Sequence, residues 1–289
     1  MNMRFLKIFI GDWQQDEKAA EQARYLSALL ICCLLLVGFS TGVFGWKAIV
    51  LALIAGFASM AVEFAFASVR KKPMTGGAFV YGLALSLLVP PTMPTWIILL
   101  AAIAGTVFAK EVFGGAKNAI FNPALIGIGL ILFSYPANTA GASMGNLNAI
   151  EGGVAWQNGI WLLLGCLAIQ IIARPSSLFI YIPVIVFPWL LAKYVIADKA
   201  LPLEGNLKLI FSEDCFLLAG ILLAVDPGNA PRHWPGKIIY GLIIGILSIL
   251  MRCFAKYPYA MVFAILVADC IAPSLDMLFA TKTTKEVAK

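Results

Sequence analysis

GGAFVYGLALSLLVPP, residues 76–91, has a counterpart in SEDCFLLAGILLAVDPGNAP, residues 212–231. Each is a short apolar segment that ends at proline, and each precedes a longer apolar run, at 95–113 and at 236–254. Short spans interrupted by Pro or Gly, at matching places of two halves, are typical of membrane proteins with inverted repeats. We therefore predict two related halves of five helices each. An odd number of helices brings the chain to the opposite side of the membrane, so the second half has the inverted orientation.

Composition places the chain in a membrane. Of 289 residues, 61% are hydrophobic and 12% are charged, whereas soluble domains carry about 25% charged residues. The apolar runs are longer than the roughly 10 alternating residues of a barrel strand, so helices must satisfy the backbone in lipid. The sequence predicts an all-α membrane protein with about ten transmembrane helices in two inverted five-helix repeats, at 25–45, 48–68, 76–90, 95–113, 121–136, 158–173, 178–197, 214–226, 236–254 and 259–277.

Lysine and arginine set the expected orientation. They gather in the loops on the side of the N-terminus, and the loop 137–157 has neither, which by the positive-inside rule places both termini in the cytosol of a bacterial inner membrane. These anchors explain the net charge of +6, so we expect membrane lipid and no nucleic acid as a partner. We therefore divide the chain into a cytosolic segment (1–24), a first membrane repeat (25–136), an extracytoplasmic loop (137–157), a second membrane repeat (158–277) and a cytosolic tail (278–289).

The stretch GGAKNAIFNPAL, residues 114–125, has the residue types of a polar binding site. Asn122 can cap the helix that follows, with Pro123 at its first position. Asn118 and Asn122 offer amides that both donate and accept, which suits the uracil-like edge of an isoalloxazine ring. A plain helix cap is the alternative. In the second half, Asp226 ends a short helix on the same predicted face, where it could bind a ring N–H, a cation or solvent.

Two acids fall inside apolar runs. Asp269 lies in the middle of 259–277, and Glu63 lies near the inner end of 48–68. Because intramembrane acids are costly, we assign both to a candidate ion path, although Glu63 could also extend to the interface. The six cysteines are interpreted as small buried hydrophobes, with metal ligation between helices as the alternative. One histidine, His233, excludes a bis-histidine haem within this chain.

The segment GGAKNAIFNPALIGIGLILFSYP, residues 114–136, resembles a family of membrane subunits that includes the D-type subunit of the Rnf complex and the B-type subunit of the sodium-translocating NADH:quinone reductase. LLAVDPGNAP, residues 222–231, and GKIIYGLIIGILSILMRCFAKYPYAMVFAILVADCIAPSLD, residues 236–276, agree with it. The resemblance implies a ten-helix bundle within a multisubunit ion-pumping electron-transfer complex. It also implies a riboflavin or FMN held non-covalently by Asn118, Asn122 and Asp226.

One feature of that family is missing. Its flavinylation motif, Ser/Thr-Gly-Ala-Thr after an acid, lies in a long outer loop, whereas here the loop 137–157 offers only AGAS, residues 140–143. Ser143 could accept a phosphoester-linked flavin, but the short loop without the acid favours the loss of covalent FMN.

The favoured function is therefore a flavin-dependent membrane subunit that moves electrons across or within the membrane, coupled to Na⁺ or H⁺ transport. We expect it to need other subunits of the complex and not to catalyse alone, because the sequence has no nicotinamide site. Two alternatives stay open: a solute channel or carrier with the same inverted-repeat fold, and a non-redox scaffold for partner subunits. Fold analogy alone does not separate them.

Overall fold

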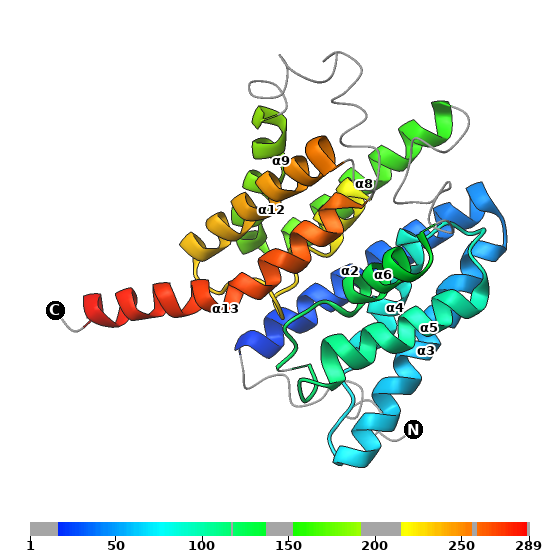
Figure 1. The fold of residues 1–289 in the computed structure, drawn as a ribbon, viewed down its shortest axis with the longest axis horizontal. Coiled ribbons are helices and arrows are strands. Elements are labelled where there is room, and N and C mark those ends of the chain that lie inside the picture. Colours follow the sequence, from blue (N-terminus) through cyan, green and yellow to red (C-terminus); the bar gives the residue numbers. More distant parts are fainter. Residues whose placement is uncertain (1–16, 117, 137–152, 192–214, 256–258, 288–289) are drawn as a thin grey trace.

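The computed structural model describes residues 17–116, 118–136, 153–191, 215–255 and 259–287, and these residues form helices joined by turns and loops. The first half contains α2 (Glu17–Phe44), α3 (Lys47–Arg70), α4 (Gly77–Leu88), α5 (Thr95–Thr106) with a π-helical turn η1 (Val107–Glu111), and α6 (Pro123–Ser134). The second half contains α8 (Gly153–Ala173), a 3₁₀ turn η3 (Pro175–Ser177), α9 (Leu178–Leu191), α11 (Phe216–Leu222), α12 (Trp234–Ala255) and α13 (Ala260–Val287). Figure 1 shows α2–α6 gathered on one side of the molecule, and α9, α12 and α13 on the other.

The helices confirm an all-α, multi-pass membrane protein. Four are long and apolar enough to cross a bilayer: Ala20–Phe44, Lys47–Arg70, Trp234–Arg252 and Ala260–Phe279. A fifth candidate is the pair Gly159–Ala173 and Pro175–Leu191, which is bent by 116° at Arg174. Large apolar side chains point outward from these helices, such as Phe64 at 60% and Trp161 at 71% exposure, as lipid requires. Two shorter apolar helices, α4 and α6, have 12 residues each, as their Pro and Gly boundaries predict.

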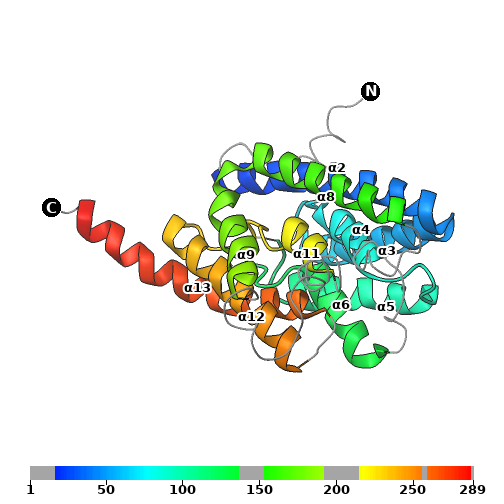
Figure 2. The same ribbon diagram turned by 90° about the horizontal axis from the view of Figure 1, so that it is seen from above.

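The two halves meet in the way an inverted repeat predicts. Helices α2 and α8 lie side by side (Figure 2), and they are antiparallel because Glu21 near the start of α2 pairs with Arg174 after the end of α8. Tyr259, at the start of α13, donates to the carbonyl of Leu88 at the end of α4. In the corresponding contact of the other half, Asn122 at the start of α6 meets Asp226 in the loop after α11. This second contact forms the candidate site.

Three of the described helix boundaries differ most from the predicted ones. Helix α2 begins at Glu17, inside the predicted cytosolic segment 1–24. Helix α8 begins at Gly153, inside the predicted outer loop. Helix α13 continues to Val287 and extends beyond the bundle (Figure 1), because Ala, Lys and Glu after Phe279 favour a helix and neither Pro nor Gly follows to end it.

Candidate functional site

Asn122 and Asp226 come together at the contact between the two halves, as predicted. The side-chain oxygen of Asn122 accepts a hydrogen bond from the backbone N–H of Ala124 at 2.9 Å and so caps α6, with Pro123 in the first turn. The same amide donates from Nδ2 to Oδ2 of Asp226 at 3.0 Å. Both side chains are buried, at 0% and 2% exposure. Asn122 is therefore a helix cap, as one of the two alternatives predicted, and its amide nitrogen also joins the two halves through Asp226.

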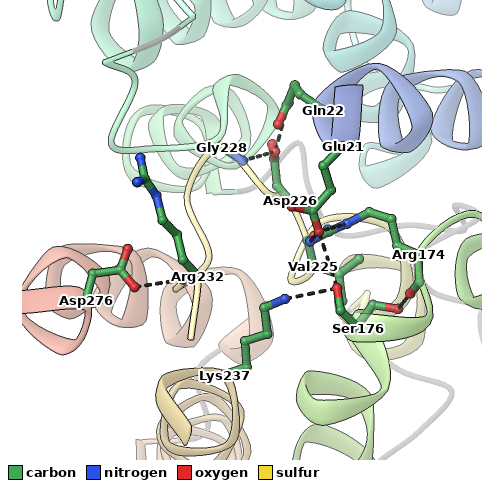
Figure 3. Close-up of polar contacts among 11 residues, drawn as sticks. Glu21, Gln22, Arg174, Ser176, Val225, Asp226, Gly228, Arg232, Lys237 and Asp276 are labelled. Atoms are coloured by element: carbon green, nitrogen blue, oxygen red, sulfur yellow. Dashed lines mark hydrogen bonds and ion pairs between the residues drawn. The ribbon is translucent and has the colours of Figure 1, made fainter. Parts of the chain in front are cut away.

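Four donors from the chain itself surround the Asp226 carboxylate. Besides Asn122, the hydroxyl of Tyr81 donates at 2.7 Å, the amide of Gln22 at 3.1 Å and the backbone N–H of Gly228 at 2.9 Å (Figure 3 shows the last two). Tyr81 comes from α4 and Gln22 from α2, so this one carboxylate ties three helices of the first half to the second half. A carboxylate with so many donors is held in one orientation and has little capacity left for a ligand N–H.

A cavity of about 450 Å³ opens beside this contact. Its walls are the loop before α6, the loop after α11 and the middle of α13, which contribute Asn118, Asn229, Arg232, His233, Asp269 and Asp276. The volume falls within the roughly 300–1,000 Å³ of small-molecule sites. Asn118 is exposed, and its amide makes no side-chain hydrogen bond within the described part of the chain. The structure thus places Asn118 and Asp269 in the cavity wall, whereas Asn122 and Asp226 lie behind it.

Asp269 is the second buried carboxylate of the site, at 1% exposure. It accepts from the hydroxyl of Tyr240 at 2.7 Å and from the amide of Asn229 at 3.4 Å. Asn229 lies between the two acids in the structure, because it lines both the large cavity and a cavity of about 20 Å³ that Asp226 borders. A space of that size holds about one water molecule.

Glu63 lies in a separate cluster at the start of α4. Its carboxylate pairs with Lys110 of η1 at 2.7 Å and accepts from the backbone N–H and the hydroxyl of Thr75 at 2.7 and 2.5 Å, and from the N–H of Ala78 at 3.3 Å. Both charged side chains are buried, at 4% and 3% exposure. Glu63 is thus a helix cap and half of a buried ion pair, and it does not extend to the interface. Its role in an ion path stays a prediction.

A charged network that was not predicted from the sequence fixes the loop carrying Asp226 (Figure 3). Arg174 donates from Nε and Nη2 to one oxygen of Glu21, at 2.9 and 2.6 Å, and from Nη1 to the carbonyl of Val225. Ser176 donates to the same Glu21 oxygen at 3.3 Å and accepts from Lys237 at 3.0 Å. These residues come from three distant parts of the chain. Of these residues, only Arg174 stands out in the sequence, because it precedes a proline between two apolar runs.

The structure also places most of the cysteines and the histidine that the sequence singled out. Cys32, Cys33, Cys166 and Cys215 are buried, while Cys270 is exposed, which confirms the packing interpretation for four cysteines. No group of three metal-ligating side chains occurs among residues with described positions. His233 lies in the wall of the cavity. Ser143, the candidate for covalent FMN, lies outside the described residues, so its role stays a prediction.

Comparisons with known proteins identify the family of this chain. The model of the NQR2, RnfD, RnfE family matches residues 15–285. Similar proteins include the B subunit of the Na(+)-translocating NADH-quinone reductase of Chromohalobacter salexigens, 27% identical over 265 residues that cover 78% of this chain and 64% of the relative. That of Neisseria meningitidis serogroup A is 30% identical over 268 residues, covering 77% and 64%, and that of Klebsiella pneumoniae is 31% identical over 257 residues, covering 75% and 62%. The chain thus spans less than two-thirds of the length of these relatives. Because the family match covers almost all of the described helices, the chain belongs to the NQR2, RnfD, RnfE family.

Proposed function

We propose that this chain is a flavin-binding membrane subunit of an ion-translocating electron-transport complex. The observation that carries the proposal is the cavity of about 450 Å³ between the two halves, with Asn118 and Asn229 in its wall. An asparagine amide presents one acceptor and two donors. Two such amides match a heterocycle edge on which carbonyl oxygens flank an N–H, which is the edge of a flavin. The amides of Asn118 and Asn229 therefore fit the polar edge of a flavin.

The chain's own residues would hold and orient the ring. Asn118 and Asn229 supply the hydrogen bonds to its polar edge, while Ala119, Ile120 and Ala272 supply apolar contacts. Asn122 and Asp226 fix the two loops that carry these residues, so they act as positioning residues. The bound flavin supplies electron-transfer chemistry that the amino acids lack. No Thr is needed in this arrangement, which is in keeping with non-covalent binding.

The location and the partners follow from the charge pattern and from the relatives. Arg70, Lys110, Arg174 and Lys237 lie at the same end of the bundle as Glu17, the start of α2. By the positive-inside rule we infer a bacterial inner membrane with both termini and the cavity on the cytosolic side. The relatives are named as one subunit of a Na(+)-translocating reductase, so we infer other subunits that deliver and remove electrons, with Na⁺ or H⁺ as the coupled ion.

The test is a purification from flavin-replete cells. We expect the full chain in detergent to be yellow, and acid denaturation to release the flavin into an ultrafiltrate. Asn118→Ala is expected to lower flavin retention about tenfold at unchanged stability, because it removes hydrogen bonds worth about 1–1.5 kcal/mol. Asn122→Ala is the matched comparison, since it should lower thermal stability together with flavin content.

Three results would count against the proposal. Colourless protein from flavin-replete cells contradicts flavin binding. Solute flux through liposomes that contain the lone, colourless chain supports a carrier. Co-purification with partner subunits, without either flavin or flux, supports a scaffold.

A further inference from the structure

Arg174 joins two parts of the chain that approach it from different directions (Figure 3). Its Nε and Nη2 donate to Oε1 of Glu21 at 2.9 and 2.6 Å, and its Nη1 donates to the backbone carbonyl of Val225. Glu21 lies near the start of α2, whereas Val225 directly precedes Asp226 in the loop after α11. A buried, planar guanidinium offers its donors in fixed directions, so Arg174 holds the carboxylate and the carbonyl in one relative position.

The loop after this carbonyl is a compact turn. The backbone carbonyl of Asp226 accepts from the N–H of Asn229 at 3.1 Å, and its carboxylate accepts from the N–H of Gly228 at 2.9 Å. The turn at 226–230 is therefore a connected unit, which the first half holds at the Asp226 carboxylate. A unit that is held at one point can still rotate, whereas Arg174 supplies a second anchor and so fixes the direction of the Asn229 amide.

Arg70 forms the same kind of bridge in the first half. Its Nη1 donates to Oε2 of Glu111 at 2.7 Å, and its Nη2 donates to the backbone carbonyl of Glu111 at 2.5 Å. The same carbonyl accepts from the N–H of Gly114 at 3.0 Å, and the carbonyl of Gly115 accepts from the N–H of Asn118 at 3.1 Å. The loop that carries Asn118 thus also starts at a backbone carbonyl that an arginine holds.

We propose that Arg174 and Arg70 are positioning residues of the flavin site, which orient the amides of Asn229 and Asn118 respectively. Neither arginine is among the described residues that line the cavity, so each acts through the backbone that it holds. Hydrogen bonds weaken steeply when donor and acceptor are misaligned, and two amides from different halves must be aligned to bind one ring edge. The positioning role rests on the proposed function, because it requires a ligand that contacts both amides.

The test is the conservative replacement of each arginine by lysine. Arg174→Lys keeps the positive charge beside Glu21, but a compact ammonium lacks the fixed fork of donors that also holds the carbonyl. We expect the dissociation constant for riboflavin, measured by equilibrium dialysis of the full chain in detergent, to rise about tenfold, because one amide loses well-aligned hydrogen bonds. The visible absorption band of the bound flavin should shift toward that of free riboflavin. Arg70→Lys gives an independent measurement through Asn118, with the same expected result.

Three control variants separate positioning from stability. Glu21→Gln leaves the bond from Arg174 to the Val225 carbonyl in place, so thermal stability should fall while riboflavin affinity falls less than in Arg174→Lys. Gly245→Ala would place a methyl 3.0 Å from a carbonyl oxygen of α9, and it should lower thermal stability without changing affinity or spectrum. Lys72→Met, which removes an exposed charge just after α3, should change none of the three.

The possible failures differ in what they contradict. Unaltered protein that is colourless and does not bind added riboflavin contradicts the proposed function, and the positioning role with it. If the unaltered protein binds riboflavin and a lysine variant binds it with unchanged affinity and spectrum, the flavin site is supported and that arginine has no positioning role. The role is also wrong if Gly245→Ala loses as much affinity as Arg174→Lys, because the loss then follows from general destabilisation.

Discussion

Replacing Asp226 with alanine tests whether one carboxylate holds the two halves together. Four donors lose their acceptor in this variant. Gln22 and Gly228 are reachable by water, but Tyr81 and Asn122 are buried at 7% and 0% exposure. Leaving a buried donor unsatisfied costs about 1–3 kcal/mol, so the two buried donors together should lower the free energy of unfolding by roughly 2–6 kcal/mol.

The assay is thermal unfolding in detergent, followed by tryptophan fluorescence at one fixed scan rate. At about 2 °C per kcal/mol for a chain of this size, the apparent Tm should fall by about 4–12 °C. Asp226→Asn should give an intermediate loss, because the amide keeps one acceptor oxygen of the same shape. Asp276→Ala is the control, since Asp276 is half-buried and accepts one backbone N–H.

Two results would refute this reasoning. If Asp226→Ala unfolds at the temperature of the unaltered protein, the four contacts do not stabilise the contact between the halves. If Asp276→Ala is destabilised as much as Asp226→Ala, the loss reflects a general cost of removing a carboxylate and says nothing specific about Asp226.

Two further predictions concern stability in the same assay. Lys110→Met leaves the buried Glu63 charge unpaired and should cost about 3–5 kcal/mol; adding Glu63→Gln should recover part of the loss, and a tolerance equal to that of Lys72→Met would contradict the pairing. Gly82→Ala would place a methyl 2.4 Å from a carbonyl oxygen of α3 and should cost about 1–3 kcal/mol. Gly165→Ala, with nothing within 4 Å of the new methyl, should be neutral or stabilising, so equal effects of the two glycine changes would refute the close packing of α3 and α4.

Much of the site was predictable because its local signals are strong. Asn122 followed by proline reads as a helix cap, and the cap is present. Asp226 before proline reads as a helix end, whereas α11 already ends at Leu222 and Asp226 lies in the loop that follows. Their contact was expected from the repeat, since matching breaks in two halves meet at the same level of the bundle. By contrast, Tyr81, Gln22 and Asn229 carry no local signal, and only their positions in space make them partners of the two acids.

The distribution of roles within the site could not be read from the sequence either. Asn118 and Asn122 are four residues apart and were given the same role, yet one faces the cavity and the other is buried behind it. Glu63 and Asp269 also looked alike, but one caps a helix beside a lysine and the other lies in the cavity wall. A side chain's partners depend on the direction in which it points, and in these loops no helical or strand period fixes that direction.

By itself the sequence determined that the chain is a helical membrane protein and where its helices break, because apolar length and proline or glycine act locally and need no partner. The tertiary structure alone decided which polar groups meet: Arg174 with Glu21, Asp226 with Tyr81, and Lys237 with Ser176. Such pairs join residues tens to hundreds of positions apart. Their geometry follows from how the two halves pack against each other, which no stretch of sequence encodes locally.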